Sequence, residues 1–507
     1  MHGSIVYIVF NSKYRPSSKL SVKKVRKMKP KKNNALVPDN SDEKTKRKKK
    51  ISRRTVLKGV TVGAIGAAFA YSIEKFTLNN SSPQLPESDP AKMTYRIHPI
   101  SGDKISLLGF GCMRFPMRSE AASPRGEEID EVEAFRQVDY ALAHGVNYFD
   151  TAYMYHGGKS EEVIGRALKR YPRNRFFLAS KMPGNTISTL KEAKKIFETQ
   201  LRRCQVDYFD YYLLHAISTV QQSKKIYETN GVLDYLLEMK RAGRIRNLGW
   251  SFHGDRAMLE YILSQNVRWD FALLQLNYHD LLNKYVPQDF VTKLLPEPAQ
   301  PIWVLEKLLP TGLPLIVMEP LLGGRLARLN KKALTILQAE NLQASAASWA
   351  FRYVAGLPNV LTVLSGMTYM EHLQDNLLTY SPFKPLSERE KEALKRVLAI
   401  FITQENIPCT ACSYCMPCPY GVDIPAVFSH YNYCVDDEYI PKGVRNADYE
   451  KARRAFLVGY DRSIPELRQA MRCTGCDKCI PLCPQRIDIP GQMTRLSKFI
   501  EQLREEG

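Results

Sequence analysis

The chain has 507 residues, of which 44% are hydrophobic and 25% are charged, and its formal net charge is +21. This length predicts two or three domains, and the hydrophobic fraction is typical of a soluble protein rather than of a membrane or fibrous one. Nineteen lysines and arginines but only three acidic residues lie in residues 1–58, so the charge belongs mainly to an N-terminal tail. The tail has no interleaved aromatic residues and no recognisable nucleic-acid-binding fold, so we expect no nucleic-acid partner.

Residues 1–50 are predicted to be a basic, disordered tail, and residues 51–75 to hold a targeting signal. Arg53-Arg54 lies in the string Ser-Arg-Arg-Thr-Val-Leu-Lys, and a weakly apolar run from Gly59 to Ala70 follows it. This resembles a twin-arginine export signal, although Val56 stands where the usual pattern has Phe. The alternative is a chance arginine pair beside a short buried helix.

The resemblance implies that the twin-arginine export machinery carries the folded protein to the periplasm or to the outer face of the cytoplasmic membrane. An uncleaved signal would anchor the protein there, whereas Ala68-Phe69-Ala70 is a candidate cleavage site. If the signal is not used, the protein is expected to remain cytoplasmic. Met28 is a second candidate for the start of translation. Residues 76–92, rich in Ser and Pro, are predicted to be a linker.

Residues 93–385 alternate predicted strands with helical segments. The strands are rich in Val, Ile, Leu, Phe and Tyr, as buried parallel strands are, and are expected at Leu107–Met113, Asn147–Thr151, Phe176–Lys181, Tyr208–His215, Ile245–Ser251, Phe271–Asn277, Leu315–Met318 and Val360–Ser365. Helical periodicity marks Asp130–His144, Ser160–Arg170, Leu190–Arg203 and Val232–Arg241. Eight strand–helix units predict an α/β fold of the (β/α)8, or TIM, barrel type, with a hairpin over Tyr95–Ile105 closing its floor.

Four polar residues follow or end consecutive predicted strands, where barrel enzymes place their active sites. They are Asp150, Tyr155, Lys181 and His215, and in this order they resemble the catalytic tetrad of the aldo/keto reductases. Tyr155 is then the general acid for a carbonyl oxygen, and a nearby Lys181 is expected to lower the pKa of its phenol. Asp150 is expected to pair with Lys181, and His215 to orient the carbonyl.

Further stretches near the ends of the later predicted strands also support the resemblance, which covers residues 94–380. The resemblance implies that a nicotinamide supplies hydride. Ser251 and Gln275 would hold its carboxamide, and the last two strands would hold the phosphates. The remaining candidate cofactor-binding residues are Asn277, Met318, Glu319, Pro320, Leu321, Gly324, Ser365, Gly366, Met367, Asp375 and Asn376. Phe252 and Met318 depart from the family pattern. The segment after Gly366 lacks a basic partner for a 2′-phosphate, so a preference for NADP is not supported.

Residues 386–405 are predicted to be a connecting helix, and residues 406–507 a small, mainly helical ferredoxin-like domain. Two runs of cysteines at C-x2-C-x2-C spacing, each with a further Cys-Pro, are typical of ligands to cubane iron–sulfur clusters. Zinc and disulfides are the alternatives, but zinc sites show separated Cys pairs and disulfides between such close neighbours would be strained. The runs are Cys409, Cys412, Cys415 and Cys418, then Cys473, Cys476, Cys479 and Cys483.

We expect two [4Fe–4S] clusters with crossed ligation, as in two-cluster ferredoxins. Cys483 would complete the first set, and Cys418 the second. The first run departs from the pattern because only two residues separate Cys415 from Cys418. Cys112, Cys204 and Cys434 lie outside the runs and are expected to be small buried residues.

The combination predicts an exported oxidoreductase of aldo/keto reductase type. It would reduce a carbonyl or oxidise an alcohol, while clusters relay electrons to or from a partner, expected at the membrane. One alternative is a cytoplasmic NAD(P)H-dependent carbonyl reductase with structural clusters. The other is a non-catalytic electron-transfer module on a degenerate barrel. The substrate is a small carbonyl compound or alcohol that the sequence does not identify, because variable loops build its pocket.

Overall fold

A computed structural model describes residues 87–118, 128–282, 301–441 and 443–506. The predicted tail, the twin-arginine segment and all but the end of the predicted linker lie outside the described residues. Among the helices that the structure describes, none is both long enough and apolar enough to cross a membrane.

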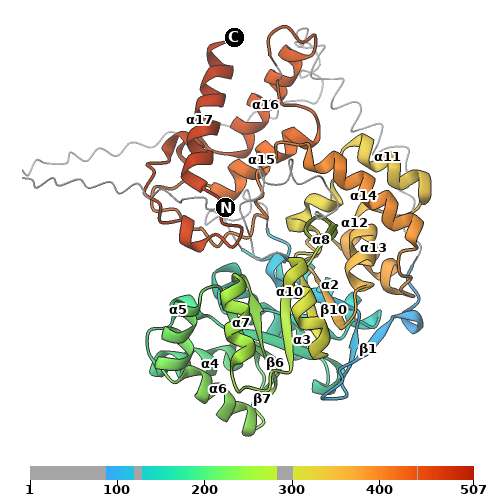
Figure 1. Ribbon diagram of the computed structural model, residues 1–507, viewed down its shortest axis with the longest axis vertical. Coiled ribbons are helices and arrows are strands. Elements are labelled where there is room, and N and C mark those ends of the chain that lie inside the picture. The colour runs from blue at the N-terminus through green and yellow to red at the C-terminus, as the bar shows by residue number, and fades with distance from the viewer. Residues whose placement is uncertain (1–86, 119–127, 283–300, 442, 507) are drawn as a thin grey trace, which may run out of the picture. The chain divides into compact units, whose positions relative to one another are not determined.

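Within the described residues, eight parallel strands close into a barrel in the order β10-β3-β4-β5-β6-β7-β8-β9 (Figure 1). The predicted (β/α)8 fold is therefore confirmed, and most predicted strand ends lie within two residues of the observed ones. The strands are β3 (Leu108–Gly111), β4 (Tyr148–Asp150), β5 (Phe177–Met182), β6 (Phe209–Ile217), β7 (Ile245–Phe252), β8 (Phe271–Gln275), β9 (Leu315–Met318) and β10 (Val360–Ser365).

The strands are apolar on both faces because each face packs against something. Inside the barrel, Tyr148, Tyr211 and Phe271 are fully buried in one cluster. Outside, alternate strand residues join a larger cluster with the surrounding helices. These helices are α2 (Glu131–Ala143), α3 (Lys159–Leu168), α4 (Leu190–Cys204), α5 (Val220–Ser223), α6 (Val232–Arg241), α7 (Arg256–Ser264), α8 (Tyr278–Leu282), α10 (Pro301–Leu308), α12 (Ala346–Ala355) and α13 (Met370–Tyr380). Helix α11 (Lys331–Glu340) packs in a separate cluster.

The predicted hairpin closes one end of the barrel. Strand β1 (Tyr95–Ile97) pairs antiparallel with β2 (Lys104–Ser106), and Gly102 supplies the turn at a φ of 76°. Ile105 is buried in the inner cluster of the barrel. The Tyr211 hydroxyl donates to Asp103 Oδ2 at 3.0 Å, which ties the turn to the bottom of β6.

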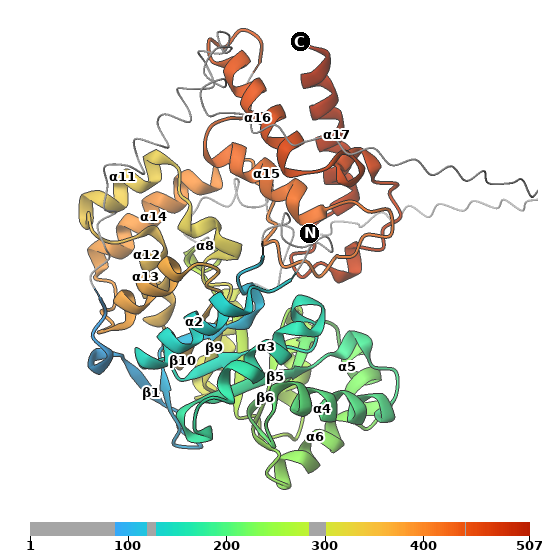
Figure 2. The same ribbon diagram turned by 180° about the vertical axis from the view of Figure 1, so that it is seen from behind.

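The predicted connecting helix is α14 (Glu388–Ile402). It begins at a capping box in which Ser387 and Glu390 satisfy each other's backbone groups. Leu394, Leu398 and Phe401 are buried in a cluster with side chains of α8, α11 and α12, and both views show these helices together (Figure 2). Helix α14 is therefore packed on the barrel rather than free between two domains.

The C-terminal region is mainly helical, as predicted. Its helices are α15 (Ile424–Asp436), α16 (Tyr449–Ser463) and α17 (Ile489–Glu505). The first two belong to the insertion between the cysteine runs. Phe428, Phe456 and Leu496, one from each helix, are buried in a core that the cysteine loops also contact.

Candidate active site and cysteine sites

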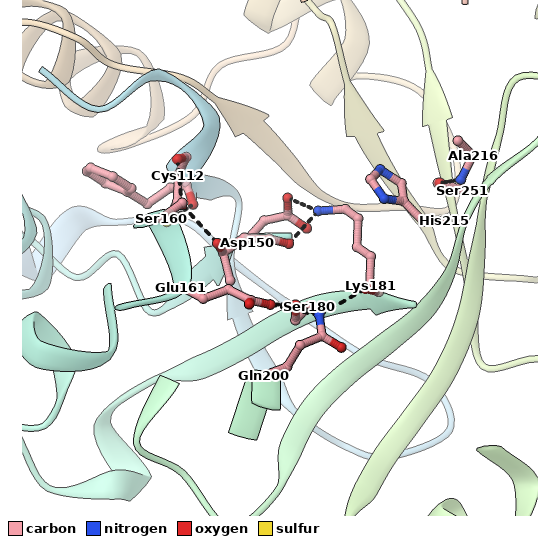
Figure 3. A network of polar contacts seen from close by, with 12 residues as sticks. Cys112, Asp150, Ser160, Glu161, Ser180, Lys181, Gln200, His215, Ala216 and Ser251 are labelled. Carbon is pink, nitrogen blue, oxygen red and sulfur yellow. Dashed lines mark hydrogen bonds and ion pairs between the residues drawn. The ribbon is translucent and has the colours of Figure 1, made fainter. Parts of the chain in front are cut away.

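The structure brings together the four residues of the predicted tetrad. Lys181 Nζ donates to Asp150 Oδ1 and to the carbonyl oxygen of Thr151 at 2.7 Å. The same atom lies 4.8 Å from the centroid of the Tyr155 ring. The ring centroids of Tyr155 and His215 are 6.3 Å apart. Figure 3 shows the Lys181 amine pointing at Asp150, with His215 on the next strand.

Burial has the largest effect on the pKa values of the buried tetrad residues Tyr155, His215 and Asp150. Burial and then the Asp150 charge raise the pKa of Tyr155 well above its ordinary value, whereas a hydrogen bond with Tyr414 lowers it. The pKa of Tyr155 is therefore raised rather than lowered as expected, because burial of the phenol has the largest effect and the Asp150 charge adds to it. Burial and the Lys181 charge hold the pKa of His215 well below 6.5, so its imidazole is neutral. Burial raises the pKa of Asp150, and Lys181 opposes this.

A buried polar network holds β5 behind the tetrad. Glu161 is fully buried, and its Oε1 accepts hydrogen bonds from Ser180 Oγ at 2.8 Å and Gln200 Nε2 at 2.7 Å. Gln200 Nε2 also donates to the Lys181 carbonyl oxygen at 3.0 Å (Figure 3). Arg203 pairs with Glu161 Oε2 at 3.3 Å. Because every partner is buried or partly buried, this network fixes the backbone from which Lys181 extends.

The residues expected to hold a nicotinamide carboxamide are engaged within the protein. Ser251 Oγ accepts a hydrogen bond from the Ala216 backbone at 2.6 Å (Figure 3). Gln275 Oε1 accepts one from Gln485 Nε2 at 2.9 Å. Asn277 Nδ2 donates to Asp280 Oδ2 at 2.8 Å. Each of these three side chains therefore already has a hydrogen-bond partner within the protein.

The remaining predicted cofactor residues gather at the ends of β9 and β10, which pair with each other. Asn376 Nδ2 donates to Ser365 Oγ at 3.0 Å, and the Ser345 hydroxyl donates to Asp375 Oδ2 at 2.6 Å. Met318 ends β9, and Glu319, Pro320 and Leu321 follow it, with Gly324 in the next turn. Ser365 ends β10, and Gly366 and Met367 follow it. Asp375 and Asn376 lie in α13.

Arg114 is a mouth residue that the sequence analysis missed. A Cβ on Gly366 would lie 2.5 Å from Arg114 Cγ, so the arginine side chain covers that glycine. Burial raises the pKa of Glu319, and the Arg114 charge opposes it. The only sequence signal was its place just after the first barrel strand.

The cysteines form two groups that cross between the two runs. Cys409, Cys412 and Cys415 line one small cavity together with Cys483. In the second group, burial raises the pKa of the Cys479 thiol, and charges on Cys473, Cys476 and Cys418 add to this effect. Ile424, Phe428 and Ile489 also line the cavity of the first group. Four soft sulfur donors around one apolar cavity fit the ligand set of a [4Fe–4S] cluster.

Among the described residues, no group of three or more His, Cys, Asp and Glu side chains is arranged to hold a single metal ion. None of the eleven cysteines forms a disulfide. Cys112, Cys204 and Cys434 are buried, as expected.

The first cysteine loop contacts the barrel mouth, which the sequence did not reveal. His215 Nε2 lies 3.0 Å from the hydroxyl of Tyr414, a residue between Cys412 and Cys415. Arg114 Nη2 donates to the Thr410 carbonyl oxygen at 2.8 Å. A Cβ on Gly323 would lie 2.5 Å from Thr410 Cα, so the loop backbone rests on the turn after β9. No signal in the sequence links these residues, which are far apart along the chain.

Comparison with known proteins agrees with this architecture. Probable aldo-keto reductase 1 of Glycine max is 32% identical over 158 residues, which are 30% of this chain and 42% of that protein. Protein tas of Escherichia coli strain K12 is 28% identical over 200 residues, 34% of this chain and 55% of that protein. The chain thus spans about half the length of these curated relatives.

A solved structure, the thermostable aldo-keto reductase Tm1743 in complex with the inhibitor epalrestat, is 25% identical and covers 60% of this chain and 100% of its own, with a TM-score of 0.47. Residues 408–487 match the model of a 4Fe-4S dicluster domain, and residues 107–399 match the model of the aldo/keto reductase family. The chain therefore belongs to the aldo/keto reductase family and carries a C-terminal domain of the 4Fe-4S dicluster type.

Proposed function

We propose that the protein reduces a small carbonyl compound, or oxidises the corresponding alcohol, with electrons that pass through its iron–sulfur domain. The observation that carries this proposal is the contact between Tyr414 and His215 at 3.0 Å. Because Tyr414 stands between two proposed cluster ligands, this contact shows that the first cysteine group lies close to the tetrad. Clusters in these two groups would supply single electrons, two in all, which is the number that carbonyl reduction needs.

The chain's own residues supply the proton and the orientation. Reduction of a carbonyl to an alcohol takes two electrons and two protons. The Tyr155 hydroxyl would donate one proton to the carbonyl oxygen, and solvent water would supply the proton of the new C–H bond and later reprotonate Tyr155. Burial raises the pKa of Tyr155, so its own proton stays in place until the carbon is reduced. A neutral His215 can donate one hydrogen bond to the same oxygen. Asp150 holds Lys181 beside the Tyr155 ring, so that a positive charge faces the phenolate that forms.

We propose two [4Fe–4S] clusters with the crossed ligand sets. Cys409, Cys412, Cys415 and Cys483 would hold one, and Cys473, Cys476, Cys479 and Cys418 the other. Protein purified without oxygen should then contain about eight iron atoms and as many sulfides. Zinc in place of iron would contradict the proposal.

We propose that a one-electron partner meets the second cysteine group. The loop around these cysteines is open to solvent, and large apolar side chains such as Leu467 and Met471 are 71% and 54% exposed beside it. The first group lies against the barrel and is therefore less suited to a partner. An exposed apolar patch next to a cluster suits a weak, transient redox contact.

The decisive experiment mixes protein reduced by dithionite, and freed of excess dithionite, with an aromatic aldehyde such as benzaldehyde. Reoxidation of the clusters and formation of benzyl alcohol in a ratio of about two electrons to one alcohol would support the proposal. The matched control is Tyr155→Phe, which keeps the ring and loses the hydroxyl. Turnover with NADH or NADPH alone, at a rate that does not change when the iron is removed, would instead support the nicotinamide-dependent reductase with structural clusters. Absence of turnover with both reductants would support the non-catalytic module.

We also propose export through the twin-arginine route, with the redox partner at the membrane. The support is Arg53-Arg54 with its basic, weakly apolar flanks. Replacing both residues by lysine keeps the charge but should leave the protein in the cytoplasmic fraction. If fractionation is the same for the variant and the original chain, the export proposal fails.

A further inference from the structure

Tyr414 sits where two catalytic groups converge. Its hydroxyl lies 3.0 Å from His215 Nε2 and is near enough to the Tyr155 hydroxyl for each group to shift the pKa of the other. The His215 and Tyr414 rings meet edge to face, with centroids 6.0 Å apart. One oxygen atom therefore lies close to both residues that the proposed function assigns to a substrate carbonyl oxygen.

We propose that the Tyr414 hydroxyl occupies the place of the substrate oxygen, so that a carbonyl or carboxylate ligand binds only by displacing it. The inference rests on the proposed function for the roles of Tyr155 and His215, but not for the source of electrons. On this inference Tyr414 determines which ligands enter the site. Tyr414 belongs to the iron–sulfur domain rather than to the barrel.

Displacement of Tyr414 should change the environment of the first cysteine group. Tyr414 is adjacent to Cys415 and two residues from Cys412, so movement of its ring changes the surroundings of both sulfur atoms. The loop is held at its start, where Arg114 binds the Thr410 carbonyl oxygen. Between that anchor and Cys415 the backbone takes left-handed conformations at Ala411 and Ser413, with φ of 50° and 63°, which residues other than glycine adopt at some cost.

The test uses acetate, a small carboxylate that does not depend on the shape of the substrate pocket. Calorimetry on the oxidised protein measures its affinity without turnover. Tyr414→Phe keeps the ring and deletes the competing hydroxyl, so acetate should bind roughly 5- to 100-fold more tightly, the value of about two net hydrogen bonds. The matched control, Tyr420→Phe, changes an exposed tyrosine after the same cysteine run and should leave the affinity unchanged.

If the hydroxyl instead helps to bind the ligand, Tyr414→Phe will bind acetate more weakly, and the inference is wrong. Equal affinity of the variant and the original protein, or no binding to the variant, would also overturn it. Iron content shows whether the variant keeps its clusters.

A second measurement does not need the variant. Acetate added to the reduced original protein should change the paramagnetic resonance spectrum of one cluster, and the change should saturate with the calorimetric affinity. Binding of acetate without any spectral change would contradict displacement of Tyr414. Neither measurement depends on aldehyde turnover, so failure of the proposed electron route leaves this test intact.

Discussion

Replacing Lys181 by methionine tests the buried ion pair on which the active site is built. The Lys181 and Asp150 side chains are 1% and 4% exposed. Methionine keeps an unbranched apolar stem but removes the ammonium group, which donates to Asp150 and to the Thr151 carbonyl oxygen. Among the described residues Asp150 Oδ2 has no hydrogen-bond partner, so nothing else is in place to compensate the carboxylate.

Breaking a buried pair in this way costs about 3–5 kcal/mol. Since domains are stable by only about 5–15 kcal/mol, the loss is a large share of the total. Adding Asp150→Asn to Lys181→Met removes the uncompensated charge and should recover at least ~2 kcal/mol. The double-mutant cycle therefore separates the orphaned charge from lost packing.

Tryptophan fluorescence during urea unfolding is a suitable assay. All four tryptophans, Trp250, Trp269, Trp303 and Trp349, lie in the barrel, so the signal reports the barrel and not the iron–sulfur domain. Burial already raises the pKa of Asp150, and Lys181 opposes this, so the lysine-free variant should raise it further. The folded variant then binds a proton that the unfolded chain releases near its ordinary pKa of about 3.9, and its stability falls as pH rises. A variant as stable as the original protein at pH 7, or a loss independent of pH, would refute this reasoning.

Three further outcomes are expected. Tyr155→Phe should keep fold and iron content but slow carbonyl reduction roughly 10²- to 10⁴-fold in stopped-flow assays, as loss of a general acid does. Burial lowers the pKa of His156 to about 4, whereas the ordinary value is about 6.5. The contribution of His156 to stability is therefore present above about pH 6.5 and is lost as the pH falls toward 4. His156→Asn, which tolerates the φ of 51°, should make stability depend less on acid pH when unfolding is followed by circular dichroism. Cys483→Ser should lower iron from about eight to about four atoms and remove the acetate-responsive spectrum, whereas Cys204→Ser, a buried barrel cysteine, should change neither.

The barrel could be predicted because its strands carry their own signal. Parallel strands buried on both faces need unbroken apolar runs, and β9 and β10 begin and end where the sequence indicated. The polar residues at the strand ends then identify the mouth. Asp150, Lys181 and His215 come together because the closed sheet brings neighbouring strand ends to one edge.

The parts of the site that could not be predicted are those made by distant segments. Tyr414 and Gln485 reach the barrel from the cysteine loops, 199 and 210 residues along the chain from their partners. No periodicity or spacing encodes such contacts. The direction of the Tyr155 pKa was also missed, because the sequence shows that a lysine is near but not how deeply the phenol is buried or that the Asp150 charge acts on it.

The proposed function explains why the tetrad and the cysteine loops meet in one place. Hydride from a nicotinamide needs an open binding face beside Ser251 and Gln275, yet Gln275 is bound by Gln485 from the second cysteine loop. Transfer of single electrons needs only a short distance between the cluster that donates them and the site that accepts them. The Tyr414 contact with His215 places the first cysteine loop beside the tetrad, while the loop of the second group is exposed to solvent. Under the proposed function, a barrel that receives electrons through its own fused domain would keep Tyr155 as proton donor, while Gln275 contacts that domain rather than a nicotinamide.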